Sequence, residues 1–382
     1  MPVWHEALKK IRRETGLAVV GITQEQHPER CSLFRQWQEL DWPILWDPFN
    51  LTGAEMVPNF TAVDEHGVVR LRRARLESFR QDFLDRTFPA SGPPADRLEG
   101  VPGLGAIRAF LAASPAERDV SALVAALEDL ARKNPKDAAL SFRLGVALRL
   151  RHDSPARRPD DFGRAVAVWS HALALRPGQY IWRRRIQQYG PRMDKPYPFY
   201  DWIGRAQAEL RARGEEPVAQ LVPLAAAERA EPSRGPAATG KPPVEPDPRG
   251  GVPADPGFVR LETVAVPGTG DRPVWRLYLS LAPAPDKGVS WDNGAGPLQV
   301  WLDAGSLPAG ALLDRQLLEA PLPDREHSSE ERVLEAEIAL PAPGAGAAEL
   351  RGYAVFGICE EQTGACRWLR RDFRLPLVWD GA

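Results

Sequence analysis

The stretch from residue 214 to residue 256 most constrains the fold, because Pro, Ala, Gly and charged residues dominate it. A stretch of this kind buries too little apolar surface to offset the entropy lost on ordering, so we expect a semi-extended linker. Helical patterns precede it, and short alternating strands follow it. At 382 residues, the chain is also too long for one hydrophobic core. We therefore expect several domains that differ in secondary structure.

Composition excludes several classes of function. The formal net charge is −2, with 49 Lys and Arg against 51 Asp and Glu, so no positive excess attracts nucleic acid. No apolar run approaches the roughly 20 residues that cross a bilayer, and the charged N-terminus is not typical of a signal peptide. The six histidines are scattered, and the three cysteines lack zinc-site spacing, so we expect no metal site and no cofactor.

Residues 1–88 alternate between helical and strand patterns, which is typical of an α/β domain. An amphipathic helix is predicted over 3–14, and Gly16 separates it from a buried strand over 17–22. Pro28 suits the first turn of a second helix, which we expect to reach residue 40. The remaining expected elements are a strand over 44–46, an extended segment over 57–63, a turn at 64–67, a strand over 68–71 and a helix over 76–88.

Three motifs follow one another in this part of the chain: Val19-Val-Gly-Ile22, then Trp42-Pro-Ile-Leu45 with Asp47, then Val57-Pro58 with Asp64 and Gly67 behind it. With the order of the elements, they resemble the redoxin (AhpC/TSA, thioredoxin-like) branch of the thioredoxin superfamily. The resemblance implies a thioredoxin-like fold over 1–88 and thiol–disulfide or antioxidant chemistry. It also implies a cis peptide bond before Pro58, with Val57 and Pro58 on the substrate side of the active site.

The catalytic Cys-x-x-Cys segment of that family is missing from these residues. Family members begin with an apolar strand, Trp-Cys-x-x-Cys and a linker commonly ending in Glu-Met-Pro, whereas this chain begins Met1-Pro2-Val3-Trp4. The missing strand belongs between 17–22 and 59–63, so we expect an N-terminally truncated domain. Three explanations stay open: a true start upstream of Met1, a selenocysteine codon read as a stop, and a degenerate domain that binds without catalysis.

Cys31 is the other candidate nucleophile of this part. It falls in the first turn of the helix expected over 28–40, beside Arg30, and such positions favour a thiolate. However, no resolving cysteine is near it in sequence, and the redoxin family uses a different helix. We therefore expect a half-buried packing cysteine.

Residues 104–213 are predicted to be helical throughout. A set of positions resembles one full tetratricopeptide repeat with half-repeats on each side, and residues 151–161 lengthen its internal turn. Such a TPR-like array presents a concave surface to a peptide or protein, and a spacer between the outer domains is the alternative. The Arg- and aromatic-rich stretch 182–202 either grips an anionic or peptide ligand or, as we favour, caps the array and packs on the next domain. The matching positions are Asn134-Pro-Lys-Asp-Ala138, Phe142, Gly145, Ala165, Trp169, Ala172 and Pro177.

Residues 257–382 show short alternating strands broken by Pro and Gly, which is typical of a β-sandwich. The last two expected strands flank Cys359 and Cys366, with a turn at 362–364 between them. Opposite cysteines in such a hairpin can reach the roughly 5.5 Å Cα separation of a disulfide. The expected strands cover 274–281, 298–302, 333–340, 350–358 and 367–377.

Several of these positions resemble the immunoglobulin-like N-terminal domain of the transmembrane thiol–disulfide interchange reductases. They are Trp291-Asp-Asn293, Pro297-Leu298, Trp301, Tyr353 and the Cys-x6-Cys hairpin. The resemblance implies that Cys359 and Cys366 carry electrons to extracytoplasmic partners. The spacing is one residue longer than in that family, so a structural disulfide, a redox-active pair and two free thiols all stay open.

The expected fold class is multidomain α/β + α + β: an incomplete thioredoxin-like fold (1–88), a TPR-like helical array (104–213), a linker (214–256) and an immunoglobulin-like β-sandwich (257–382). The leading hypothesis is a redoxin-type thiol–disulfide oxidoreductase, partial or inactive without its Cys-x-x-Cys, whose partners are protein thiols, disulfides or peptides. A non-catalytic peptide-binding adaptor is the alternative, and a peroxidase is weaker because the peroxidatic cysteine is missing. If the true N-terminus lies upstream, a disulfide implies a periplasmic or membrane-tethered location.

Overall fold

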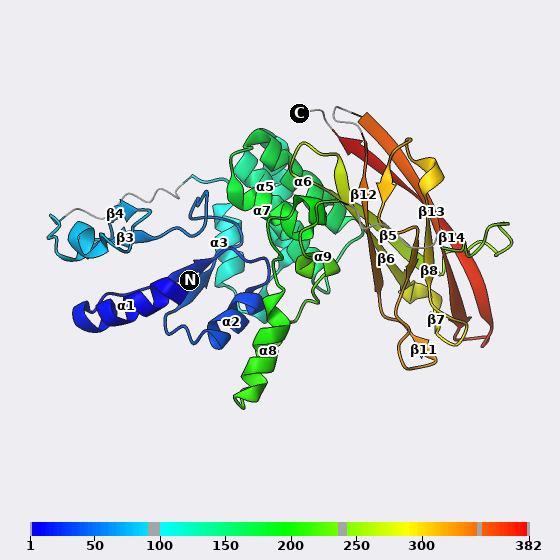
Figure 1. Cartoon of the computed structure of the whole chain (residues 1–382), viewed down its shortest axis with the longest axis horizontal. Coiled ribbons are helices and arrows are strands. Elements are labelled where there is room, and N and C mark those ends of the chain that lie inside the picture. The colour runs from blue at the N-terminus through cyan, green and yellow to red at the C-terminus, as the bar shows by residue number, and fades with distance from the viewer. Residues whose placement is uncertain (1, 91–99, 236–242, 342–345, 380–382) are drawn as a thin grey trace. The chain divides into compact units, whose positions relative to one another are not determined.

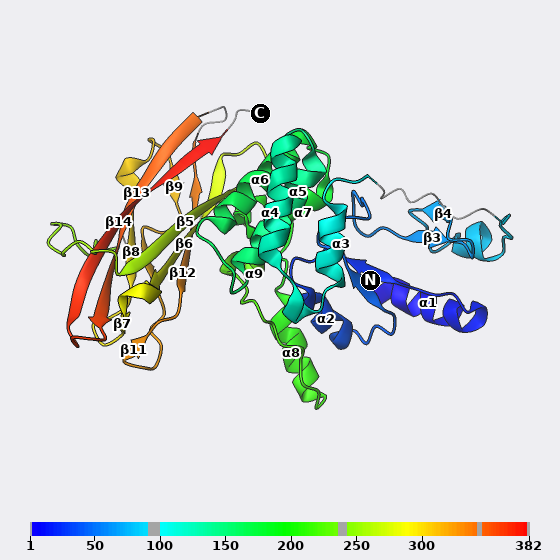
Figure 2. The same ribbon diagram turned by 180° about the vertical axis from the view of Figure 1, so that it is seen from behind.

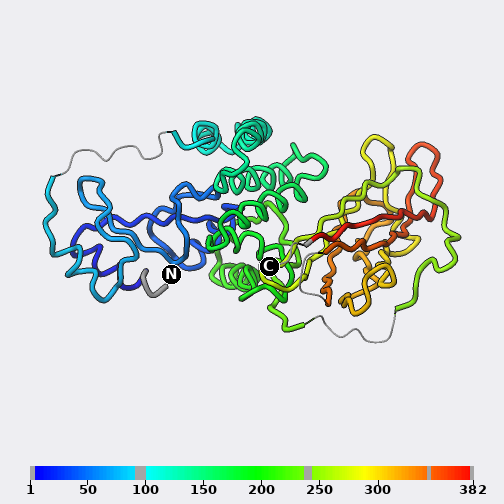
Figure 3. Tube along the Cα trace, turned by 90° about the horizontal axis from the view of Figure 1, so that it is seen from above, coloured from blue at the N-terminus to red at the C-terminus, as the bar shows by residue number. Residues whose placement is uncertain are grey.

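The computed structural model describes residues 2–90, 100–235, 243–341 and 346–379, so Met1 and its expected role lie outside it. The described residues form two compact units. Unit 1 comprises Met1–Arg184 and Asp201–Pro223, and unit 2 comprises Arg185–Tyr200 and Leu224–Ala382. The chain thus enters unit 2 at 185, leaves it after 200 and returns at 224, which can be followed by colour in Figure 3. The predicted mixture of helices and sheets in a multidomain chain is confirmed.

The first part of unit 1 has the predicted order of elements. Two of them are shorter than expected. The strand predicted over 17–22 pairs only from Gly21, because Pro43 has no N–H to continue the ladder. The helix predicted over 76–88 is a five-residue π-helix. In a continuous helix Phe88 would point away from Phe83, whereas the chain turns so that the two rings lie 5.4 Å apart. The elements are α1 (Pro2–Thr15), β1 (Gly21–Thr23), α2 (Pro28–Trp37), β2 (Ile44–Trp46), β3 (Thr61–Val63), β4 (Val69–Arg72) and η1 (Arg80–Leu84).

These strands form two separate two-stranded sheets. Strands β1 and β2 pair in parallel, and β3 and β4 pair antiparallel. Strand β1 is not hydrogen-bonded to β3, which agrees with the expectation that the two are not neighbours. One hydrophobic core nevertheless joins both pieces, since Leu8 of α1 packs with Trp42, Ala62 and Phe83. Beside the unpaired edges, Ile22 is 52% exposed and Val63 is 49% exposed.

Helices fill the rest of unit 1 and begin unit 2. Asp119 caps α4 through the amide of Ala122 at 2.8 Å, and Asp137 caps α5 through the amide of Leu140 at 2.9 Å. The helical prediction for 104–213 is confirmed in its main parts. The elements are α3 (Leu104–Ala112), η2 (Pro115–Glu117), α4 (Val120–Lys133), α5 (Ala138–His152), α6 (Asp161–Leu175), α7 (Tyr180–Tyr189), η3 (Arg192–Asp194) and α8 (Trp202–Ala212).

Helices α5 and α6 pack against each other in unit 1 (Figure 1). A Cβ atom on Gly145 would lie well inside van der Waals distance of two atoms of the Trp169 indole ring, Cδ1 and Nε1, so only glycine permits this approach. The longer turn between the helices is braced by Arg151, whose guanidinium donates two hydrogen bonds to Asp161 at 2.5 and 3.0 Å. Both partners are buried, and the bidentate geometry is the strongest that a carboxylate and an arginine can form.

The segment 214–256, predicted to be a linker, is instead held against both units. In unit 1, Gln36 donates to the carbonyl of Glu216 at 2.9 Å. In unit 2, the short helix α9 (Ala226–Arg229) contains Glu228, which is fully buried. Further on, the amide of Asp255 donates to the carbonyl of Arg370 at 2.7 Å. The segment lacks a core of its own, but single polar groups bind it to neighbouring elements. Part of the predicted linker, including Lys241 and Pro242, lies outside the described residues.

Unit 2 contains two antiparallel sheets that pack face to face (Figures 1 and 2). One has the order β10-β8-β13-β7-β11, with β14 also paired to β13, and the other has the order β5-β6-β12-β9. All five strands predicted from alternation are present. The elements are β5 (Val259–Pro267), β6 (Val274–Pro283), η4 (Pro285–Lys287), β7 (Val289–Asp292), β8 (Gln299–Asp303), η5 (Ala304–Ser306), β9 (Leu312–Leu313), β10 (Leu317–Glu319), β11 (His327–Ser328), β12 (Arg332–Ala339), β13 (Gly346–Glu360) and β14 (Cys366–Trp379).

The stretch 185–200 packs on the sheet that contains β6 and β12. The hydroxyl of Tyr278 donates to the carbonyl of Tyr189 at 2.7 Å. Nearby, buried Arg276 binds Glu335 at 2.5 Å and Glu337 at 2.6 Å. The part of the Arg- and aromatic-rich stretch from 185 to 200 therefore packs on the following sheet, as we favoured, and polar groups of this part are used inside the unit. Its role as a cap on the helical array stays a prediction.

Candidate functional site

The hairpin of β13 and β14 brings Cys359 and Cys366 together. The two residues are direct partners in the antiparallel register, and their sulfur atoms form a disulfide with the Cα atoms 4.0 Å apart. The hairpin is closed by hydrogen bonds from the Glu360 amide to Ala365 and from the Gly364 amide to Glu360. Gly364 has a φ of +66°, which favours glycine at the end of the turn. The predicted turn therefore places the two cysteines as the hairpin model requires.

The two sulfur-bearing residues differ in accessibility. Cys359 lies on the longer, central strand of the sheet and is only 6% exposed. Cys366 begins the neighbouring strand and is exposed. A thiolate that attacks a disulfide must approach one sulfur atom, and the exposed one is the accessible target. The hairpin thus has one sulfur that can be attacked and one that is protected.

Asp292, at the end of β7, contributes a carboxylate to the same site. One of its oxygen atoms and both sulfur atoms lie within 4.8 Å of one another. The carboxylate is oriented by the amides of Gly294 and Ala295, which donate to Oδ1 at 3.1 and 3.2 Å. In the sequence, Asp292 is part of the motif Trp291-Asp-Asn293, but local sequence does not reveal its role, because the pairing of β7 with β13 joins distant segments.

Gly357 makes this approach of Asp292 possible. Gly357 and Cys359 point to the same face of β13, because side chains alternate along a strand. A Cβ atom on Gly357 would lie 2.9 Å from the Cβ of Ala295 and 3.1 Å from the Cβ of Asp292. The turn that carries Asp292 therefore lies directly over a position without a side chain.

The tip of the hairpin is acidic. Glu360 pairs with Arg367 at 2.9 Å, and Glu361, which is exposed, follows it. Because Arg367 offsets the charge of Glu360, Asp292 and Glu361 are the carboxylates that make the surroundings of the sulfur atoms favourable for cations and unfavourable for anionic thiolates.

Val57 and Pro58 lie in unit 1, whereas the two hairpin cysteines lie in unit 2. The peptide bond between Val57 and Pro58 is cis, so that prediction is confirmed. Val57 is 56% exposed. The role of the two residues on the substrate side of a site remains a prediction.

Cys31 has the surroundings of a packing residue. It is half-buried in the first turn of α2, and burial raises the pKa of its thiol, although a hydrogen bond with Thr23 acts in the opposite direction. A raised pKa disfavours the thiolate, which is the reactive form. The expectation of a packing cysteine agrees with this geometry.

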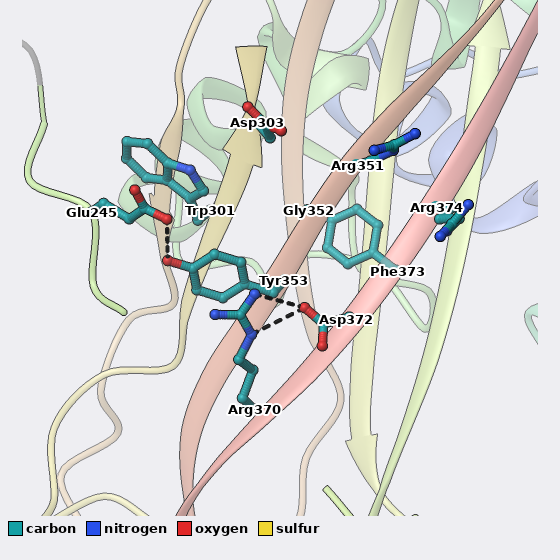
Figure 4. A pocket seen from close by; sticks show the side chains of 10 residues that line it. All are labelled: Glu245, Trp301, Asp303, Arg351, Gly352, Tyr353, Arg370, Asp372, Phe373 and Arg374. Atoms are coloured by element: carbon teal, nitrogen blue, oxygen red, sulfur yellow. Dashed lines mark hydrogen bonds and ion pairs between the residues drawn. The ribbon is translucent and has the colours of Figure 1, made fainter. Parts of the chain in front are cut away.

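A second candidate site lies on the sheet of β8, β13 and β14 (Figure 4). This hollow has a volume of about 810 Å³. The Arg370 guanidinium lies 3.6 Å from the centroid of the Tyr353 ring, and the Tyr353 hydroxyl donates to Glu245 at 3.0 Å. Arg370 also binds Asp372 at 2.8 Å. Arg351, Arg374 and Asp303 also line the hollow, so charges of both signs surround it.

In the part of the chain that the structure describes, no helix is both long and apolar enough to cross a membrane. No family model matches the chain, and no curated protein matches it. Among solved structures, the chain is similar to the N-terminal domain of DsbD from Neisseria meningitidis in its reduced form. The identity is 16%, over 32% of this chain and 86% of that domain, with a TM-score of 0.15. A TM-score of this size does not establish a shared fold, so the chemistry proposed below rests on the hairpin itself.

Proposed function

We propose that this protein takes part in thiol–disulfide exchange through the Cys359–Cys366 hairpin of unit 2. The supporting observation is the asymmetry of the disulfide: Cys366 is exposed, Cys359 is buried, and Asp292 lies beside both sulfur atoms. In this proposal unit 2 is an immunoglobulin-like domain, and unit 1 combines a redoxin-type thioredoxin-like domain with TPR-like helices. Protein thiols in an oxidising, extracytoplasmic compartment are the proposed partners, because disulfides persist there.

The exchange proceeds through a mixed disulfide. A partner thiolate attacks the Sγ atom of Cys366, the disulfide breaks, and Cys359 leaves as a thiolate that takes a proton from water. A second partner thiolate then attacks the partner's own sulfur in the mixed disulfide and releases Cys366 as a thiolate. The hairpin gains two electrons, and the partner's dithiol becomes a disulfide. In the reverse direction, the Asp292 carboxylate, within 4.8 Å of the sulfur atoms, can accept the proton of a nucleophilic thiol through one water molecule.

Serine variants in a Cys31→Ser background test this order of events. In the reduced chain, Cys359→Ser retains the accessible thiol and should accumulate a mixed disulfide with oxidised glutathione, measured by mass spectrometry. The matched variant Cys366→Ser retains only the buried thiol and should accumulate much less. Insulin reduction by the chain with both cysteines should be lost in both variants. Equal trapping, or preferential trapping in Cys366→Ser, would contradict the proposed attack site, and no insulin reduction by the parent chain would contradict the function.

A non-catalytic adaptor is the second candidate function. The observation that favours it is the pair of unpaired strand edges in unit 1, where Ile22 and Val63 are about half exposed. Such edges accept an extended peptide by strand addition. Peptides from an unbiased extended-peptide array should then bind the chain, and Ile22→Lys should weaken that binding without changing exchange at the hairpin. Binding that is unaffected by Ile22→Lys would exclude this surface.

A further inference from the structure

The reduced hairpin has the ligands of a metal site. Cys359, Cys366 and Asp292 are the one group of metal-ligating side chains whose donor atoms gather within 4.8 Å in the described ranges. We propose that, once the disulfide is reduced, these three residues bind one zinc ion. The proposal shares its cysteines with the exchange reaction, but it rests on the arrangement of three ligands and not on any partner thiol.

The donor set fits zinc. Zinc prefers thiolate, imidazole and carboxylate ligands in tetrahedral geometry, with bonds of about 2.3 Å to sulfur and about 2.0–2.2 Å to oxygen. These bond lengths place neighbouring ligand atoms about 3.5–3.8 Å apart. The two sulfur atoms must therefore separate once the disulfide is reduced, and the Asp292 oxygen, which lies within 4.8 Å of both, must move closer to them. The register sets both cysteine side chains on one face, directly opposite each other, so both sulfur atoms can bind one ion.

The surroundings support a cation at this position. The amides of Gly294 and Ala295 hold the Asp292 carboxylate, which is how outer-sphere partners orient a metal ligand. Glu361 adds negative charge at the hairpin tip. Because Cys366 is exposed, water can reach a bound ion and fill the fourth position, which is the arrangement of open zinc sites.

Zinc binding and exchange exclude each other at this hairpin. Binding requires both thiols as thiolates, so one Zn²⁺ displaces two protons, and the oxidised hairpin offers no thiolate. A partner dithiol or an added phosphine supplies the two electrons that open the disulfide. Zinc would then retain the hairpin in its reduced form and withhold its thiolates from a substrate disulfide.

Spectroscopy of the full chain tests the site directly. A Cys31→Ser chain reduced with a phosphine is titrated with Co²⁺, and Zn²⁺ affinity is measured by competition with a chromophoric chelator. The expected result is one ion per chain, with the visible bands of tetrahedral cobalt and a thiolate-to-cobalt charge-transfer band. Asp292→Asn, which keeps the local hydrogen-bond acceptor, should weaken Zn²⁺ binding at least about ten-fold, because even outer-sphere partners contribute about 10–100-fold.

The matched control is Asp286→Asn, an exposed acid on the neighbouring turn η4, which should leave Zn²⁺ affinity unchanged. Three results would overturn the site: binding no tighter than in a Cys359→Ser/Cys366→Ser chain, equal affinity in Asp292→Asn and Asp286→Asn, or equal binding by the oxidised chain. Insulin reduction is measured separately in excess chelator. A chain that reduces insulin without binding zinc overturns only this site, and a chain that binds zinc without reducing insulin overturns only the exchange function.

Discussion

Replacing Gly357 by alanine tests how the turn at Asp292 controls the disulfide. The added Cβ would lie 2.9 Å from the Cβ of Ala295 and 2.9 Å from the carbonyl oxygen of Asp292. Ordinary carbon–carbon contacts are about 3.5–4.0 Å, so the turn must move away by roughly 0.6–1 Å. The Asp292 carboxylate then moves away from the two sulfur atoms with the turn.

Two effects of Gly357→Ala follow from this displacement. Overpacking of this kind costs about 1–3 kcal/mol, and each kcal/mol lowers the melting temperature of a unit this size by about 2–4 °C. Moving a carboxylate away from the disulfide also weakens its repulsion of an anionic thiolate, so dithiothreitol should reduce the disulfide faster than in the parent chain. Urea unfolding measures the first effect, and the rate of thiol release under native conditions measures the second.

Gly352→Ala is the matched control on the same strand. Its Cβ would lie 2.5 Å from the Phe373 ring and 2.6 Å from the carbonyl oxygen of Trp301, so it should also destabilise unit 2. It lies on β13 away from the disulfide and should leave the reduction rate unchanged. If Gly357→Ala loses as much stability as Gly352→Ala but reduces at the parent rate, the turn at Asp292 does not control access to the disulfide.

Three further variants test the packing that supports the units. Arg276→Leu removes the cation that Glu335 and Glu337 share, and among the described residues only Glu337 keeps a second one, Arg192 at 3.3 Å. We expect a loss of about 3–5 kcal/mol in urea unfolding, whereas an unchanged midpoint would refute the buried pairing. Gly145→Ala places a methyl group well inside van der Waals distance of the Trp169 ring and should cost about 1–3 kcal/mol. Retention of the parent melting temperature would mean that α5 and α6 are not this close. Burial alone would raise the pKa of Asp153, but Arg149 and a hydrogen bond from a histidine outweigh it and hold the pKa well below its usual range. The stability that this lowered pKa contributes is present above about pH 3.9, the pKa of Asp in the unfolded chain, and is lost as the pH falls below it. Asp153→Asn should therefore flatten the acid limb of the curve of stability against pH. An identical acid limb would contradict the assignment.

Local patterns predicted most of the secondary structure. Alternation over 350–358 and 367–377 predicted β13 and β14, because each strand has one face in the hydrophobic core. The turn residues between these strands predicted which cysteines meet. In unit 1, Pro28 and the apolar periodicity predicted α2, and the motif at Val57 predicted the cis bond through a resemblance. These features depend on residues close together in the chain.

Local patterns were wrong where a distant partner decided the outcome. The segment 214–256 has the composition of a linker, yet Glu228 and Asp255 bind it to elements far along the chain. The helical run 104–213 belongs to two units, because the part from 185 to 200 packs on a sheet formed much later in the sequence.

The sequence by itself determined most of the helices and the longer strands of this protein, and it singled out the two hairpin cysteines. Tertiary structure alone decided that Cys359 is buried while Cys366 is exposed, and that Asp292 lies against both. The physical reason is that side-chain periodicity reports which face of an element is apolar, whereas the neighbour of that face is set by strand pairing and packing between distant segments. Gly357 illustrates the difference, since its missing side chain has meaning only once β7 lies beside β13.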